Sequence, residues 1–256
     1  MTSYYTTRHR NDGFGGQFQN IIFDILYTYT NTNNKYVFPS IQYFEHNYHN
    51  DPEHTNRLIR YMNLKDHFTI NRESENSDVV SSYTSDTYSY VEDNISNLII
   101  SEPMKHIKSL FYADKSTSLN TNHYNVAVHV RRPNSQDCRL EGSDIADEYY
   151  LNVINYIRNN HHITNKKSIQ FHIYSQGELA AYDKYINEDT VIHLNDDVLD
   201  TFNSLVFADA LVTSGSSFSY TAALLSNGVI YYKGFWHKPA DFWLIGDKLV
   251  VDPTSH

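Results

Sequence analysis

Short apolar runs rich in β-branched residues alternate with amphipathic segments through the C-terminal half of the chain. Such runs are typical of strands buried on both faces, and the segments between them are typical of helices. Strands are predicted at 124–130, 168–174, 191–194, 210–213 and 229–232. Helices are predicted at 146–157, 178–185, 199–208 and 216–225. This alternation predicts a doubly wound parallel sheet with helices on both faces.

The N-terminal half carries a weaker version of the same pattern. Strands are predicted at 3–7 and 35–39, and the glycine-rich segment 11–19 between them predicts a turn. Apolar residues at helical spacing then predict a helix that carries Phe18, Ile21, Ile22, Ile25 and Leu26.

Further along, Asp51 and Pro52 predict the N-cap and the first residue of another helix. Residues 70–92 are rich in Ser, Glu, Asp and Asn and predict an irregular excursion. The isoleucines and leucines of 95–110 predict a helix that closes this half of the chain.

A polar stretch at 115–122 predicts a domain boundary, which divides the chain into domains 1–120 and 121–256. The sequence thus predicts an α/β fold of two Rossmann-like domains that face a cleft. The last residues are expected to pack back on the N-terminal domain.

Composition narrows the classes of function. The formal net charge of −10 disfavours a broad surface for DNA or RNA, so any phosphate site must be local. The 22 Tyr and 13 Phe suit sugar rings and bases, and they suit packed strands equally well. One cysteine, Cys138, an N-terminus without signal-peptide character and the lack of a long apolar run predict a cytoplasmic protein with no membrane span.

Candidate binding residues follow the ends of the predicted strands, where ligands sit in open α/β sheets. His129, Arg131 and Arg132 stand at the end of the first C-terminal strand. Arginine binds phosphate bidentately and keeps its charge at any working pH. The alternative is a surface arginine pair that bridges to acidic helices.

Small hydroxyl residues open the helix predicted at 216–225. Ser214, Ser216, Ser217 and Phe218 lie where backbone N–H groups and the helix dipole can bind an anion. Ordinary serine capping is the alternative. An arginine pair and such a helix start on neighbouring strands together predict a clamp for a diphosphate.

Two further strand ends offer polar groups for a base or a ribose. Tyr174, Ser175 and Gln176 end one strand, and Asn195 and Asp196 end the next. A plain turn and helix capping are the respective alternatives.

Several of these segments together resemble motifs of the α-1,2- and α-1,6-fucosyltransferase superfamily. The run from His129 to Arg132 resembles its His-x-Arg-Arg motif, 200–220 resembles its later Ser-Ser-Phe-Ser motif, and 13–19 resembles its N-terminal Gly-Gln loop. A closer resemblance is to the small glycosyltransferases of large algal viruses, including chlorovirus β-xylosyltransferases. That resemblance lies in segments 12–17, 45–47, 174–177, 216–220 and 235–237.

This resemblance implies a GT-B fold whose N-terminal domain binds a glycan acceptor and whose C-terminal domain binds a nucleotide sugar, UDP- or GDP-linked. It also implies inversion by direct displacement, with no metal and no cofactor. Independently, the sequence has no Asp-x-Asp, the spacing with which metal-dependent glycosyltransferases commonly hold a divalent cation on the diphosphate. Arg131 is then the first choice, and Arg132 the second, to meet the charge of the leaving diphosphate.

Inversion also requires a general base for the acceptor hydroxyl. The loop after the strand predicted at 35–39 offers Glu45 and His46, and Asp12 beside the glycines is a further candidate. His49 and Asp51 of the same loop are expected to contact the acceptor, although Asp51 also suits an N-cap.

Three residues of the glycine-rich segment, Gly15, Gly16 and Gln17, are expected to lie close to the donor, since glycine lets backbone approach a ligand. Trp236 is expected to form an aromatic platform for the acceptor sugar, although core packing is the more common fate of a tryptophan.

Other functions remain open at this point. Pro133 and Asn134 stand where fucosyltransferases continue with an acidic residue, which argues against GDP-fucose and favours a non-catalytic sugar- or nucleotide-binding module as the alternative. A dehydrogenase would need a third glycine where the chain has Phe18. A zinc site is disfavoured because His46 and His49 have no second pair of ligands at tight spacing.

Overall fold

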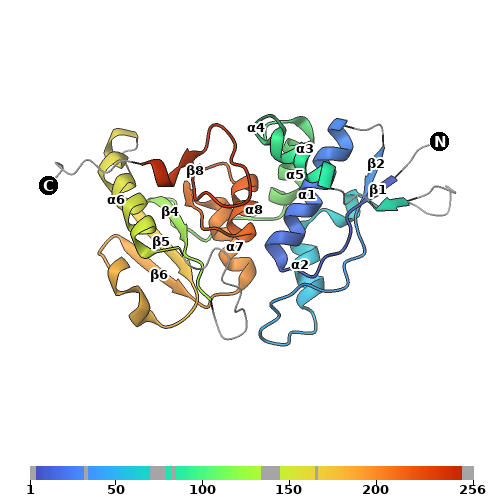
Figure 1. The fold of residues 1–256 in the computed structure, drawn as a ribbon. Coiled ribbons are helices and arrows are strands. Elements are labelled where there is room, and N and C mark those ends of the chain that lie inside the picture. The colour runs from blue at the N-terminus through green and yellow to red at the C-terminus, as the bar shows by residue number, and fades with distance from the viewer. Residues whose placement is uncertain are drawn as a thin grey trace. The chain divides into compact units, whose positions relative to one another are not determined.

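The computed structural model describes residues 4–31, 34–69, 79–81, 85–133, 145–164 and 167–249 (Figure 1). The chain divides into two compact units, here called unit 1 (Met1–Lys115) and unit 2 (Ser116–His256). The division lies close to the boundary predicted at residue 120. Among the helices of the described ranges, none combines the length and apolar character that a membrane crossing requires. Asn134 and Cys138 lie outside these ranges.

Unit 1 contains a small parallel sheet and a group of helices. Its strands are β1 (Tyr4–Thr6), β2 (Lys35–Val37) and β3 (Val79–Ser81). Its helices are α1 (Phe14–Asn31), α2 (His54–Met62), α3 (Ser85–Asp93), α4 (Ile95–Leu98) and α5 (Glu102–Tyr112), with a 3₁₀ helix at Lys65–His67. The strand order is β2-β1-β3, and Tyr5 of β1 lies opposite Tyr36 and Val80.

Helix α1 lies at the centre of unit 1 because apolar residues occupy most of its circumference. Phe18 and Leu26 are fully buried. The Phe18 ring lies 6.1 Å from Phe111 of α5, and the Phe23 ring lies 5.2 Å from Tyr88 of α3. A helix that is buried on nearly every side must be covered by other elements, and here α3, α5 and the sheet cover it.

The glycine-rich turn predicted at 11–19 is shorter than expected. Helix α1 begins at Phe14, so Gly15 and Gly16 lie in its first turn and are buried. The turn is therefore confined to the residues before Phe14. Glycine in these two positions must be explained by packing in the helix and not by a loop.

Helix α2 also begins later than predicted. Its first residue is His54 and its N-cap is Glu53, so Pro52 is not the first helical residue. The Asp51 carboxylate instead accepts the backbone N–H of Glu53 at 2.8 Å and caps the turn before the helix. The prediction was wrong by two residues because a short polar side chain caps turns and helices equally well.

Two predictions for the end of unit 1 are wrong. The segment 70–92, predicted to be irregular, contains β3 and most of α3. The helix predicted at 95–110 is two helices, because Ser101 caps α5 by accepting the Met104 N–H at 3.4 Å, with Pro103 in its first turn. A proline at that position starts a helix more readily than it continues one.

Unit 2 contains the larger parallel sheet that the sequence predicts. Its strands are β4 (Tyr124–His129), β5 (Ile169–Ser175), β6 (Thr190–Leu194), β7 (Ala210–Val212), β8 (Val229–Tyr232) and β9 (Leu244–Ile245). Its helices are α6 (Asp147–Thr164), α7 (Val198–Phe207) and α8 (Ser217–Leu225), with 3₁₀ helices at Leu179–Tyr185 and Gly246–Lys248. The helix predicted at 178–185 is thus a 3₁₀ helix.

The strand order in unit 2 is β6-β5-β4-β7-β8-β9, and every pair is parallel. From β4 the chain moves outward to β5 and β6, and then returns to the other side of β4 to form β7. Val128 and Ile173 pack on one face of the sheet with Tyr150 and Ile154 of α6. The mixed α/β class with a parallel sheet is confirmed.

The residues from β8 up to Leu249 form part of unit 2, since β9 pairs with β8 and Gly246 lies against Tyr149. The packing expected of the last residues on the N-terminal domain stays a prediction. A Cβ atom at position 246 would lie 2.6 Å from the Tyr149 hydroxyl, so only glycine fits there. Residues 250–256 lie outside the described residues.

Candidate functional site

The sheet of unit 2 has one point at which the strand order reverses, between β4 and β7. In open parallel sheets, ligands bind at such a switch point, outside the carboxyl ends of the strands. β4 ends at His129 and continues to Arg131, and β7 is followed by Ser214 and Ser216. His129 Nδ1 lies 2.9 Å from Ser214 Oγ, so a hydrogen bond joins the two strand ends. We call His129, Arg131, Ser214, Ser216 and Ser217 the switch-point site.

His129 enters this site as a neutral group. Burial, and then the nearby charge of Arg131, lower its pKa from 6.5 to about 3. Its ring packs at 5.4 Å against the ring of Phe218 in α8. A neutral imidazole fixes Ser214 but adds no positive charge, so any charge for an anion at this edge has to come from arginine, lysine or the helix.

Serine hydroxyls organise the start of helix α8. Ser216 is the N-cap, and its Oγ accepts the Phe218 N–H at 3.2 Å. The Ser214 N–H donates to Ser219 Oγ at 3.2 Å. The predicted serine capping therefore exists, and the helix also directs its positive dipole end toward the carboxyl edge of β7. A cap of this kind satisfies only part of the helix N-terminus, so it does not exclude the predicted anion site.

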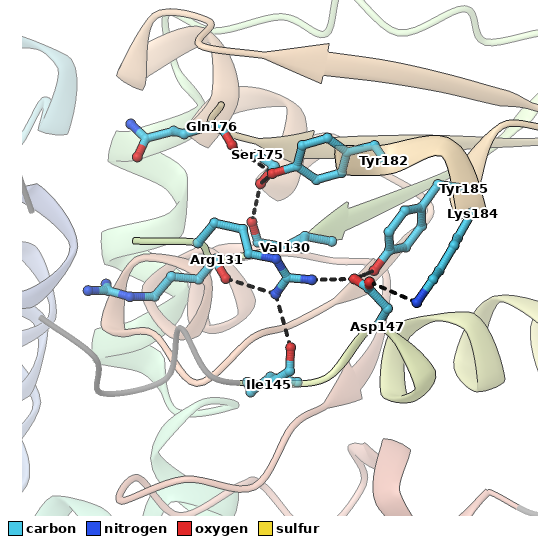
Figure 2. A network of polar contacts seen from close by, with 10 residues as sticks. Val130, Arg131, Ile145, Asp147, Ser175, Gln176, Tyr182, Lys184 and Tyr185 are labelled. Carbon is cyan, nitrogen blue, oxygen red and sulfur yellow. Dashed lines mark hydrogen bonds and ion pairs between the residues drawn. The ribbon is translucent and has the colours of Figure 1, made fainter. Parts of the chain in front are cut away.

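The two arginines of the predicted pair have different surroundings (Figure 2). Arg132 donates to the carboxylate of Asp147 through Nη2 and to the Ile145 carbonyl through Nη1 at 3.0 Å. Asp147 also accepts the Tyr185 hydroxyl at 2.8 Å, and Lys184 Nζ lies 3.6 Å away. The guanidinium of Arg132 is thus held by residues at the start of α6. This agrees with the alternative prediction, in which the arginine pair bridges to an acidic helix.

Arg131 extends away from this network in Figure 2. Its charge lies close enough to lower the pKa of His129, which places the guanidinium beside the switch point. Lys233, after β8, is paired with Asp247 at 2.5 Å. Arg132 and Lys233 are thus both paired with carboxylates, and the role predicted for Arg131 at a diphosphate stays a prediction.

Ser175, expected to contact a donor, instead ties strand ends together. Its Oγ donates to the Val130 carbonyl at 2.6 Å and lies 2.5 Å from the Tyr182 hydroxyl. The Tyr182 hydroxyl in turn lies 2.6 Å from the carbonyl oxygen of Gln176 (Figure 2). These bonds hold the ends of β4 and β5 in register and leave the Gln176 side chain half-buried at the edge.

The other residues predicted to contact a base or a ribose also make contacts within the protein. Tyr174 is buried, and its ring stacks on His193 at 4.5 Å. Asn195 makes two 3.0 Å hydrogen bonds with the backbone of Gly177, which closes the β5 and β6 loops on each other. Asp196 is exposed, with its carboxylate 3.4 Å from His193 Nδ1. Asp196 is thus the residue of this group that best suits a ribose.

Trp236 lies in the loop after β8, beside the switch-point site. Its indole N–H donates to His237 Nε2 at 3.1 Å, and that nitrogen lies 3.3 Å from Ser217 Oγ. His237 stacks on Tyr220 of α8 at 4.6 Å. The tryptophan is 58% exposed, so a fixed aromatic face stands next to the start of α8. The acceptor contact that the sequence predicts for Trp236 stays a prediction.

Unit 1 brings a second group of candidates together at the carboxyl ends of β1 and β2. The Asp12 carbonyl accepts the Glu45 N–H at 3.1 Å. The Gln17 side chain donates to the carbonyls of Asp12 and Tyr43, at 3.0 and 2.9 Å. Gln17, expected to contact the donor, thus cross-links the two loops from a buried position. We call Asp12, Gly13, Glu45, His46 and Tyr48 the loop cluster.

Two glycines make room for side chains of the loop cluster. A Cβ atom at Gly13 would lie 2.6 Å from Cδ2 of His46. One at Gly16 would lie 2.2 Å from Oδ2 of Asp12. The glycine-rich motif therefore accommodates two candidate bases, whereas the sequence suggested that it admits a ligand.

The acceptor contacts predicted in this loop differ in their surroundings. His49 is exposed. Asp51 is held by the Glu53 N–H and by Arg57 at 3.0 Å, and these hydrogen bonds lower its pKa. Asn47 adds two further hydrogen bonds, both of 2.8 Å, to the backbone of Asp51. Asp51 therefore has a structural role that its sequence position only partly indicated.

Within the described parts of the chain, no group of three or more His, Cys, Asp or Glu side chains is arranged to hold a metal ion. A metal-independent reaction remains a prediction from the sequence.

Three residues were missed as members of these sites. Tyr48 bonds His46 Nδ1 at 2.9 Å, Asp147 holds Arg132, and His237 links Trp236 to α8. Asp147 could have been found from its place at the start of a predicted helix, where acidic residues gather. Tyr48 gives no periodic signal, because its role depends on a turn.

Comparisons with known proteins give a limited result. No family model matches the chain, and no curated protein matches it either. Solved structures of fucosyltransferase NodZ from Bradyrhizobium are similar, at 12% identity over 88% of this chain and 94% of that chain, with a TM-score of 0.43. The NodZ alpha-1,6-fucosyltransferase soaked with GDP-fucose is 12% identical over 88% of this chain and 93% of that chain, with a TM-score of 0.43. Because the TM-scores are low, the function proposed below depends on the site and not on these neighbours.

Proposed function

We propose that this protein is an inverting, metal-independent glycosyltransferase of GT-B type that moves a sugar from a nucleoside-diphosphate sugar to a glycan hydroxyl. The observation that carries the proposal is the switch-point site. His129, Arg131 and the serine-capped start of α8 meet where β4 and β7 reverse the strand order. Ligands with a phosphate group favour this place in parallel α/β sheets.

The residues of unit 2 supply what a departing diphosphate needs. As the glycosidic bond to the donor breaks, negative charge grows on the diphosphate, and fixed donors lower the energy of that state. Arg131 offers a planar, permanently charged fork for two oxygens. The start of α8 adds its dipole, and neutral His129 holds Ser214 in place.

Unit 1 supplies the candidates for the general base, since Asp12, Glu45 and His46 are gathered in its loop cluster. A xylosyl or fucosyl donor linked to UDP or GDP fits the sequence resemblance. We assign the glycan acceptor to unit 1 on the same ground.

Calorimetric titration with UDP, GDP, UMP and GMP tests the donor site. We expect one diphosphate to bind at least about tenfold more tightly than its monophosphate, because the second phosphate adds contacts to Arg131 and α8, worth about 1.4 kcal/mol or more. No preference for a diphosphate would contradict the proposal. Binding of UDP-xylose or GDP-fucose without any turnover would favour a non-catalytic binding module.

Removal of divalent cations is expected to leave the rate unchanged, because Arg131 and the start of α8 supply the charge that a metal would supply. Initial rates of donor consumption before and after EDTA treatment measure this. A rate that falls with EDTA and returns with Mn²⁺ would contradict the metal-free mechanism.

A further inference from the structure

The structure assigns the general base of the loop cluster to His46, with Tyr48 as the positioning residue that fixes its imidazole. This inference rests on the proposed function, since it names the group that activates the acceptor hydroxyl. His46 is one of the three candidates that unit 1 gathers, with Asp12 and Glu45, and its geometry carries the assignment.

The Asp12 carboxylate is engaged at the start of helix α1. Its Oδ1 accepts the Gly13 N–H at 2.7 Å, and Oδ2 lies over Gly16 in the first turn of the helix. These contacts give Asp12 a structural role at the start of α1.

His46 is held in an unusual backbone conformation. Its φ is +70°, in the left-handed region that side chains rarely adopt. Among the described residues, three other non-glycine residues have a positive φ, and all three are asparagine, which tolerates it. A histidine there is retained at a cost, and such conformations gather at functional sites.

The imidazole of His46 is fixed from two sides. Its Cδ2–Nε2 edge faces Gly13, where a Cβ atom would lie 2.6 Å from Cδ2 and 3.1 Å from Nε2. On the other side, Nδ1 lies 2.9 Å from the Tyr48 hydroxyl. The hydrogen bond at one ring nitrogen sets the role of the other. When Nδ1–H donates to Tyr48, Nε2 carries the lone pair that a base requires.

The chemical step balances with these groups. The acceptor oxygen bonds to the anomeric carbon while its proton passes to His46 Nε2. The bond between the anomeric carbon and the diphosphate oxygen breaks, and its electron pair stays on the diphosphate. His46 then returns its proton to water. Imidazole suits this exchange because its ordinary pKa, about 6.5, lies close to neutral pH.

The first test follows hydrolysis of UDP-xylose and GDP-fucose between pH 4 and pH 9, with water as the acceptor. We expect wild-type kcat/KM to fall in acid, because a protonated imidazole cannot accept the proton of the attacking hydroxyl. His46→Gln should lower kcat by about 10²- to 10⁴-fold and abolish that fall. Added imidazole should restore part of the rate of His46→Ala. His67→Gln, an exposed histidine in unit 1, is the matched control.

The second test concerns Tyr48. Tyr48→Phe should lower kcat by about tenfold with an unchanged KM and the same acid fall, because the base stays but its ring is less fixed. Tyr29→Phe, at a tyrosine that is 46% exposed, should change nothing. A Tyr48→Phe enzyme with wild-type kcat would overturn the positioning role.

Different experimental results would contradict the assignment of the base and the proposed function. If His46→Gln still turns over and its rate falls only near pH 4, a carboxylate is the base and the assignment to His46 is overturned, while the glycosyltransferase stands. If wild-type protein neither binds a nucleoside diphosphate nor consumes either donor, the proposed function fails and the base assignment fails with it. Calorimetry on His46→Gln should show wild-type affinity for the diphosphate.

Discussion

Replacement of Arg131 by alanine is expected to lower kcat/KM for the donor by about 10²- to 10³-fold, with little change in Tm. The reason is that Arg131 stands at the end of β4, in the switch-point site, whereas Arg132 and Lys233 are held by Asp147 and Asp247. Initial rates and calorimetry with the preferred nucleoside diphosphate measure the two effects. Normal turnover with normal nucleotide affinity in Arg131→Ala would contradict the donor site.

Arg132→Ala is the matched control for Arg131→Ala. Both variants remove an arginine side chain, but the two arginines differ in their contacts. Arg132→Ala leaves the partly buried carboxylate of Asp147 without its main partner, which costs about 2 kcal/mol of unfolding free energy, or roughly 4–8 °C in Tm. The diphosphate affinity of the folded variant should stay within about threefold of wild type. If Arg132→Ala instead loses diphosphate binding at unchanged Tm, the roles of the two arginines must be exchanged.

The difference between these two arginines shows where sequence reasoning stops. The sheet of unit 2 could be predicted because buried parallel strands leave continuous β-branched runs, and the ends of those runs point to the ligand-binding edge. The sequence of a strand does not show which of the side chains at its end forms an ion pair within the protein. The partner of Arg132 is Asp147, 15 residues further along the chain, so the pair becomes visible only in three dimensions.

Unit 1 was harder to predict for a related reason. Strand β3 is three residues long and α3 is built largely from Ser, Asp, Tyr and Glu, so neither has a clear apolar period. Their positions depend on tertiary contacts, such as the packing of Tyr88 on Phe23 of α1. Weak local propensity is overridden by such contacts, and the polar composition of 70–92 was therefore misleading.

The glycines of unit 1 illustrate the same limit. A glycine-rich motif after a strand suggests a backbone that approaches a ligand, and the sequence cannot distinguish this from room made for a side chain. Here the atoms that exclude a Cβ at Gly13 and Gly16 belong to His46 and Asp12. The structure thus shows that these glycines make room for side chains, and their contact with a donor stays a prediction.

Replacement of Gly13 by alanine is expected to lower kcat by about tenfold or more and to destabilise the protein by about 1–3 kcal/mol. The added Cβ would lie 2.6 Å from His46 Cδ2, and the ring has little freedom to move because Tyr48 holds Nδ1. Initial rates and Tm measure the change. Gly234→Ala is the control, since its Cβ would meet only an Asp247 oxygen at 3.8 Å.

A double-mutant cycle separates this collision from any effect on the backbone. Gly177 is the glycine found with a positive φ among the described residues, so the backbone at Gly13 accepts alanine without strain. Once His46→Ala has removed the ring, Gly13→Ala should therefore be neutral or should stabilise by about 0.4–1 kcal/mol, because alanine restricts the unfolded chain. Equal destabilisation by Gly13→Ala with and without the ring would show that the glycine is needed for another reason. Its link to His46, and with it the fixed position of the imidazole, would then be lost.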